Sequence, residues 1–279
     1  MRIFASAAAT TLIAAGVWLA IACSGGSRPA AAVAAAPPAD ATEPGPAAQA
    51  KYTAGAVSNG GSIAGTITVE GEIPEAEKIV PDKDEQADRC GAQIADDSLI
   101  VNASNKGVKD ALVYIEGIAS GKEMKVSTKV APAILDQKGC MFTPHVLVVN
   151  AGSVIEFRNS VDPISHNTNV ASKFGQGFNK LFPIGASGEQ AMVKEPEMLP
   201  VNCDIHKWMT AKVWVMGNPY WALTDGSGGF KIDQVPPGTY EVKVWHDKLK
   251  ATTVKVTVEA GKEAKVDAAL AGKPKRRGR

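Results

Sequence analysis

Short stretches in which apolar and polar residues alternate recur from about residue 62 onwards. Side chains of a β-strand point to opposite faces in turn, so this alternation predicts strands with one buried face. Clusters of Gly, Pro, Asn and Asp between the stretches are turn signals. The pattern therefore predicts an all-β protein built from sandwiches. The predicted strands include 62–69, 111–115, 154–159, 212–216, 230–232, 240–245 and 253–258.

The first residues have the features of an export signal. Arg2 supplies a positive start, and residues 3–22 form an uncharged apolar run that ends in small side chains. We interpret residues 1–22 as a signal peptide. An uncleaved membrane anchor is the alternative, because the run is nearly long enough to span a bilayer. The stretch Leu-Ala-Ile-Ala-Cys at 19–23 also resembles a lipobox, which predicts lipidation of Cys23.

Two segments outside the alternating region lack the side chains that build a core. Residues 23–61 are rich in Ala, Pro, Gly and Ser, which predicts a flexible linker. Residues 272–279 form a short basic tail. The formal net charge of the chain is +1, which gives no sign of a nucleic-acid partner.

Three side chains that bind soft metals lie close together near residue 206. Cys203, His206 and Met209 occur in the run Cys-Asp-Ile-His-Lys-Trp-Met. A mononuclear type 1 copper site needs a thiolate, a thioether and two imidazoles. His166, which follows the predicted strand 154–159, is the candidate for the second imidazole. We expect these four residues to bind one copper ion. Ordinary core filling is the alternative, and zinc is disfavoured because Met is not a usual zinc ligand.

Residues 136–216 resemble the cupredoxins, above all those of the amicyanin and pseudoazurin type. The resemblance lies in the spacing Cys-x₂-His-x₂-Met, in the strand 210–215 after it, and in residues 141–157, which are similar to the strands leading to the first ligand. It implies a cupredoxin-like Greek-key β-sandwich. In that family the residue after the first His braces the ligand loop and donates toward the Cys sulfur, a role that falls here to Asn167.

The flanking segments resemble a second family, the carboxypeptidase regulatory-like β-sandwich. Residues 224–242 match its Thr-Asp-Gly and Pro-Pro-Gly region, while its first two strands match residues far upstream, at 65–69 and 109–115. We therefore expect a discontinuous outer sandwich, 62–135 with 217–271, into which the copper domain is inserted. Simple tandem domains are the alternative. Insertion predicts one shared core containing Ile67, Val113, Phe230, Tyr240 and Val242.

With Cys23 lipidated and Cys203 on copper, two of the four cysteines remain, so we expect Cys90 and Cys140 to form a disulfide in an exported protein. His145 and His246 are expected to be structural or surface residues. The cupredoxin resemblance implies a non-enzymatic carrier of single electrons between redox proteins. The signal peptide and the lipobox-like sequence predict export to the periplasm or cell envelope and a lipid anchor at Cys23. A copper carrier or sensor and a cell-surface interaction module are the alternatives.

Overall fold

A computed structural model describes residues 51–73, 75, 78–81 and 88–273. The expected signal peptide 1–22, Cys23, residues 24–50 of the linker and residues 274–279 of the tail lie outside the described residues, so those expectations stay predictions. Residues 44–279 form one compact unit. In its described part the fold is all-β, as the alternation predicted, with a helical turn at 88–90. No helix in this part has the length and apolar character needed to cross a bilayer.

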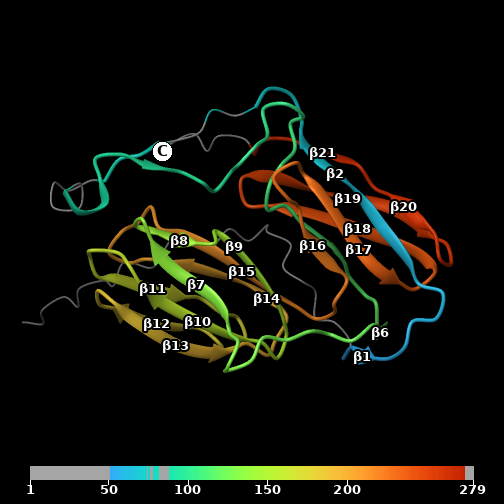
Figure 1. Ribbon diagram of the computed structural model, residues 1–279, viewed down its shortest axis with the longest axis horizontal. Coiled ribbons are helices and arrows are strands. Elements are labelled where there is room, and N and C mark those ends of the chain that lie inside the picture. The colour runs from blue at the N-terminus through green and yellow to red at the C-terminus, as the bar shows by residue number, and fades with distance from the viewer. Residues whose placement is uncertain (1–50, 74, 76–77, 82–87, 274–279) are drawn as a thin grey trace, which may run out of the picture. The chain divides into compact units, whose positions relative to one another are not determined.

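One sandwich joins strands from both ends of the described chain. Figure 1 shows β2, in cyan, lying among the orange and red strands of the C-terminal region. β2 lies between β17, which is antiparallel to it, and β20, which is parallel to it, and β21 also pairs with β2. The two sheets have the strand orders β17(Gly229–Val235)-β2(Gly61–Val69)-β20(Glu263–Lys265), with β21(Ala268–Leu270), and β16(Trp221–Leu223)-β5(Leu112–Ile115)-β18(Gly238–His246)-β19(Leu249–Val258).

The core of this outer sandwich contains residues from both of its segments. Ile67, Val113, Phe230 and Val242 are buried in a single apolar cluster, and Tyr240 packs against it. These are the residues for which insertion predicted a shared core. Each segment supplies strands to both sheets, and neither completes a sheet alone, so burial of either segment depends on the other.

The second sandwich is continuous in sequence. Its sheets have the strand orders β13(Ala186–Met192)-β10(Val154–Asn159)-β7(Ala133–Lys138)-β8(Met141–Thr143) and β12(Phe178–Phe182)-β11(His166–Val170)-β14(Glu197–Asn202)-β15(Thr210–Met216)-β9(Val146–Asn150). β7 begins at Ala133, so residues 133–135, which we had expected in the outer sandwich, belong to this one.

The chain leaves and re-enters the outer sandwich through neighbouring strands. β5 ends at Ile115 and β16 begins at Trp221, and the two strands pair side by side with Tyr114 opposite Trp221. The inserted sandwich therefore occupies the position of the loop that would otherwise connect β5 to β16. Its two ends lie close together, as is common for domain termini.

The alternation along two strands explains how the sandwiches pack against each other. Val113 on β5 and Val213 on β15 point into the cores of their own sandwiches. Tyr114 and Trp214, one residue further along each strand, meet in a third cluster that joins the two. Their rings lie 5.6 Å apart, and Trp245 lies 5.0 Å from Trp214. Both faces of β5 and of most of β15 are thus buried, and this agrees with the nearly continuous apolar sequence of the two strands.

Two short ladders complete the described structure. β1(Thr53–Ala54) pairs with β6(Ser120–Gly121), and the hydroxyl of Tyr52 donates to the carbonyl of Lys122 at 2.5 Å. The last residues of the expected linker are therefore ordered, because Tyr52 packs on the outer core. β3(Lys78–Ile79) pairs with β4(Ile94–Ala95) close to the Cys90–Cys140 disulfide.

Candidate metal centre

The ligand loop joins two antiparallel strands. β14 ends at Asn202, which pairs with Thr210 at the start of β15. Between them, the N–H of Cys203 donates to the carbonyl of Met209 at 3.1 Å, and the N–H of Met209 donates to the carbonyl of His206 at 2.9 Å. These two bonds fold residues 203–209 into a tight loop. The side chains of Cys203, His206 and Met209 are all buried.

His166 reaches the same place from β11, which pairs with β14. Its Nδ1 lies 2.9 Å from Nδ1 of His206, and Sγ of Cys203 lies 3.7 Å from that second nitrogen. The three donor atoms all lie within 4.8 Å of one another. The structure thus brings together His166, Cys203 and His206, and it buries Met209 in the same apolar cluster as Cys203.

Hydrogen bonds favour the thiolate form of Cys203. Burial alone would raise the pKa of this thiol, but hydrogen bonds from the two imidazoles and from two backbone N–H groups lower the pKa of Cys203 to about 5. The backbone donors are Asn167, at 3.4 Å, and His206, at 3.3 Å. The sulfur is therefore a ready anionic ligand near neutral pH.

Asn167 braces the loop as the cupredoxin resemblance implied. Its side-chain oxygen accepts the N–H of Asp204 at 3.0 Å, and its amide nitrogen donates to Asn179 at 2.5 Å. Its backbone N–H, rather than its side chain, is the group that donates to Cys203. Asn167 therefore links β11, β12 and the ligand loop.

One buried carboxylate at this site was not among the sequence predictions. Asp162 Oδ2 lies 2.8 Å from Nε2 of His166, on the side of the ring that faces away from Cys203. Burial would raise the pKa of Asp162, but hydrogen bonds from His166 and from the backbone of Cys140 and Gly139 outweigh burial and lower it. The sequence offered only one signal, an aspartate four residues before His166.

The outer side of the site is covered. Trp208 stands 5.1 Å from the His206 ring and donates from Nε1 to the carbonyl of Cys140 at 3.0 Å. Cys140 forms the expected disulfide with Cys90, and both half-cystines belong to a small cluster that includes Trp208. His206 is fully buried beneath this cover.

The donor set fits a copper ion. Two imidazole nitrogens and a cysteine sulfur converge in a buried space, and a buried thioether belongs to the same apolar cluster as that sulfur. This is the ligand chemistry of type 1 copper. Nε2 of His206 is buried and, among the described residues, has no hydrogen-bond partner. This nitrogen lies across the ring from the donor cluster. Nδ1 of His206 faces Nδ1 of His166 and Sγ of Cys203 instead, and Nδ1 is therefore the atom that a metal ion would contact.

The other two histidines lie away from this cluster. His145 is 3.0 Å from the carbonyl of Thr210 through Nδ1 and 2.8 Å from Asp247 through Nε2. Burial would raise the pKa of Asp247, but its hydrogen bond with His145 and the charge of Lys212 outweigh burial and hold that pKa below its usual range. The two contacts of His145 join the inserted sandwich to the turn between β18 and β19. His246 is buried beside this pair.

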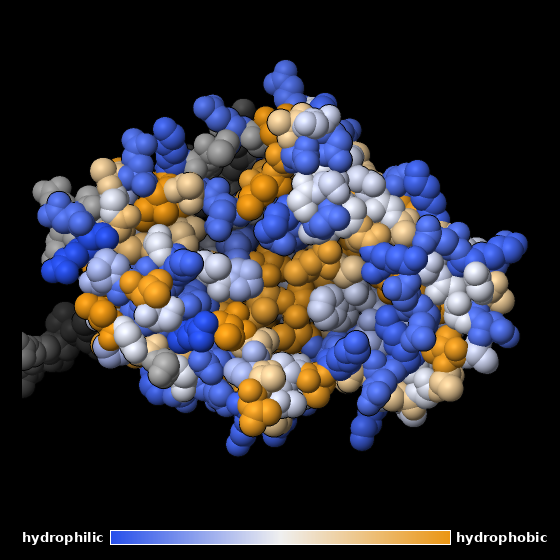
Figure 2. All heavy atoms as spheres, in the orientation of Figure 1, coloured by the Kyte–Doolittle hydropathy of each residue, from blue (hydrophilic) through white to orange (hydrophobic). Residues whose placement is uncertain are grey.

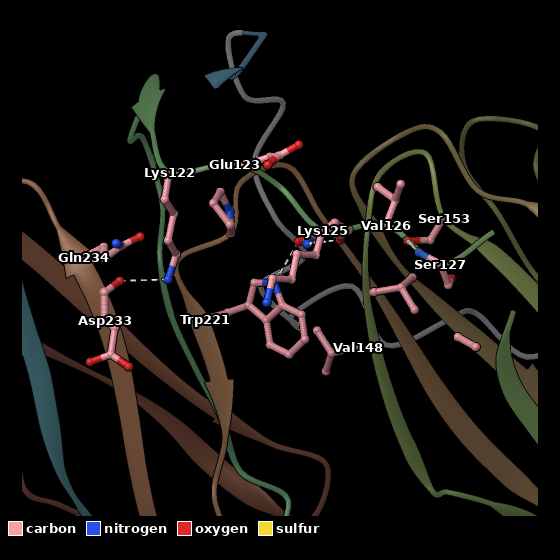
Figure 3. A pocket seen from close by; sticks show the side chains of 14 residues that line it. Lys122, Glu123, Lys125, Val126, Ser127, Val148, Ser153, Trp221, Asp233 and Gln234 are labelled. Carbon is pink, nitrogen blue, oxygen red and sulfur yellow. Dashed lines mark hydrogen bonds between the residues drawn. The ribbon is translucent and has the colours of Figure 1, made fainter. Parts of the chain in front are cut away.

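A cleft lies near Trp221 and Val148. It has a volume of about 820 Å³, and its described lining includes no cysteine or histidine. Figure 3 shows the Trp221 ring beside Val148, with Lys122 pointing to the backbone of Asp233. Figure 2 shows a hollow whose apolar floor is bordered by hydrophilic side chains. The cleft is thus chemically distinct from the metal centre.

Comparisons with known proteins match parts of the chain. A family model described as polysaccharide lyase family 4, domain II, matches residues 204–266. The matched residues run from the ligand loop through β15 into the C-terminal segment of the outer sandwich. No carboxypeptidase regulatory-like model matches, so the expected resemblance to that second family has no support. A comparison with curated proteins finds no match.

Solved structures similar to part of the chain include cupredoxins and a copper-containing nitrite reductase. A purple cupredoxin from Nitrosopumilus maritimus is 19% identical over 30% of this chain and 99% of its own, with a TM-score of 0.26. Amicyanin from Paracoccus versutus is 17% identical over 34% and 95%, with a TM-score of 0.27. A copper-containing nitrite reductase from Thermus scotoductus is 21% identical over 33% of this chain but only 25% of its own, with a TM-score of 0.28.

Proposed function

We propose that this protein is an exported type 1 copper protein that transfers single electrons between redox partners. One observation carries the proposal. His166, Cys203, His206 and Met209 are buried, and the first three aim their donor atoms at one another over distances that a single ion can bridge. The bound copper would supply the one-electron chemistry.

The side chains around the ligands favour a metal ion that changes its oxidation state while the positions of its ligands stay fixed. Cys203 is fixed by two N–H donors, and the Asn167 side chain fixes the loop next to it. Such contacts hold the donors in one geometry for both oxidation states. The four ligands leave no open position for a substrate, which favours electron transfer over catalytic turnover.

Burial also separates this proposal from the alternative of a copper carrier or sensor. A carrier must exchange its metal with a partner, and exchange needs a ligand that another protein can reach. None of the four ligands is more than 1% exposed, and Trp208 with the Cys90–Cys140 disulfide covers His206. These features favour retention of the ion.

The setting of the protein is part of the proposal. A disulfide is typical of oxidising compartments, which supports export to the periplasm or cell envelope. The lipobox-like sequence before Cys23 supports a lipid anchor, and the linker after it would let the sandwiches reach a partner away from the membrane. We propose redox proteins as the partners.

The test is the optical spectrum of the purified protein after addition of Cu(II). We expect an intense absorption band in the red part of the visible spectrum, because the thiolate of Cys203 transfers charge to the metal, and we expect reversible reduction. Cys203→Ser removes the thiolate and should abolish the band. Met209→Leu is the matched control. It should keep the band and raise the reduction potential, because a weaker axial donor favours Cu(I).

A band that survives in Cys203→Ser would refute the copper site. A wild-type protein that binds copper but loses it within minutes to a chelator would favour the carrier. A protein that binds no copper would favour an interaction module, for which the cleft beside Trp221 is the feature to examine.

A further inference from the structure

The carboxylate of Asp162 is buried beside the candidate metal centre and is hydrogen-bonded to one of its ligands. It is 2% exposed, and its Oδ2 accepts a hydrogen bond from Nε2 of His166, which is fully buried. The other nitrogen of His166, Nδ1, faces His206 and Cys203. The imidazole ring of His166 therefore lies between the carboxylate and the candidate metal position.

A tight turn holds this carboxylate in place. Gly139 and Cys140 form the two-residue connection between β7 and β8, and both have positive φ, at 64° and 56°. This is the conformation of a type I′ hairpin turn, and it points two successive N–H groups to one side. Gly139 donates to Oδ1 of Asp162 at 2.6 Å, and Cys140 donates to Oδ2 at 2.9 Å.

The turn conformation is unusual for a cysteine. An L-residue other than Gly or Asn rarely adopts positive φ, and such positions persist where the surroundings impose them. Here the disulfide to Cys90 and the bond from Cys140 N–H to Asp162 both depend on that conformation.

The hydrogen bonds decide which nitrogen of His166 carries the proton. An ionised carboxylate only accepts hydrogen bonds, so Nε2 must be the donor to Asp162. That leaves the lone pair of Nδ1 free to bind a metal. A carboxylate behind a metal-binding imidazole also makes the ring a stronger base and fixes its orientation.

We propose that Asp162 is the positioning residue of the metal centre: it fixes the tautomer and orientation of His166, and its buried negative charge stabilises the more positively charged oxidation state of the metal. This proposal rests on the proposed function. The charge acts strongly because Asp162 is shielded from water and lies one imidazole ring from the site.

The experiment compares two Asp-to-Asn substitutions in the copper-loaded, full-length protein. Asp162→Asn removes the charge and keeps the shape. Asp136→Asn is the matched control, because Asp136 accepts bonds from Ser160 in the same loop and pairs with Arg158 at 3.2 Å. No bond between Asp136 and His166 is present among the described contacts.

We expect Asp162→Asn to raise the midpoint potential, so that at the wild-type midpoint the Cu(I)/Cu(II) ratio increases on the order of tenfold. We expect Asp136→Asn to leave the ratio unchanged. A folded Asp162→Asn protein that loses copper while Asp136→Asn retains it also supports positioning. An unchanged or lowered midpoint in Asp162→Asn, or an equal shift in both variants, overturns the proposal.

A second measurement does not depend on a variant that folds. In the metal-free wild-type protein, ¹⁵N NMR of the His166 ring should show the proton on Nε2. A proton on Nδ1 with a bare Nε2 overturns the proposal. This measurement needs no copper, so a failure of the proposed function, seen as a wild-type protein without the red absorption band, is distinguishable from a failure of this inference.

Discussion

The buried histidine at the end of β18 predicts a specific loss of stability in acid. His246 is 1% exposed, and its Nδ1 accepts a hydrogen bond from the backbone N–H of Lys248 at 3.2 Å. Burial, opposed by Asp247 and assisted by His145, lowers the pKa of His246 from 6.5 to about 4. The folded protein therefore keeps this ring neutral at a pH where the unfolded chain protonates it.

The direction of the effect follows from proton linkage. Above pH 6.5 the ring is neutral in both states, so His246 causes no pH dependence. As the pH falls from 6.5 to 4, only the unfolded state gains the proton, and the free energy of unfolding decreases. Between pH 7.5 and 4.5 this difference in pKa corresponds to a loss of about 2.5 kcal/mol.

The assay is urea unfolding of the metal-free protein at pH 7.5 and pH 4.5, with His246→Gln measured alongside. The glutamine oxygen can still accept the Lys248 N–H, but it does not titrate. Other groups contribute equally in both proteins, so the loss on acidification should be about 2.5 kcal/mol smaller in the variant. If wild-type and variant lose the same stability, His246 is not held neutral in the folded state and the reasoning fails.

Two further predictions concern the cover over the site. In a protein that already carries Cys90→Ser, Cys140→Gly should be more stable than Cys140→Ser by about 1 kcal/mol, because glycine adopts the φ of 56° without strain. Calorimetry measures this difference in stability, and the reverse order would contradict the prediction. Trp208→Leu should speed removal of bound copper by a chelator, while Trp208→Phe should change the rate less; equal rates in all three proteins would show that Trp208 does not shield His206.

The strands were predictable because their signal is local. The alternation over 240–244 and 253–258 directly encodes which face of each strand is more deeply buried, and both segments are strands in the structure. Residues 212–216 also form a strand, but both of its faces are buried, because its second face packs against the other sandwich. The ligand loop was recognisable for the same reason, since Cys203, His206 and Met209 follow one another within a single turn between strands. The shared core of Ile67 and Phe230 required only that half a sandwich cannot bury its own apolar face.

The missed features depend on contacts between distant segments. Nothing near Asp162 in the sequence indicates that a turn at 139–140 will supply it with two N–H donors. The cover over His206 likewise depends on a distant residue, since the carbonyl that holds Trp208 belongs to Cys140, 68 residues away in sequence. Local patterns predict periodicity and turns, whereas the partners of a buried polar group are set by tertiary packing.

The pairing of β5 with β16 has a consequence for how the two sandwiches share their stability. If the inserted sandwich were unfolded, the pairing of Tyr114 with Trp221 would close a flexible loop of roughly one hundred residues. Closing such a loop costs about 3 kcal/mol more in chain entropy than closing a tight hairpin. Once folded, with its ends together, the insert removes that cost. Anything that stabilises the insert, a bound ion included, therefore also raises the stability of strands that never touch it.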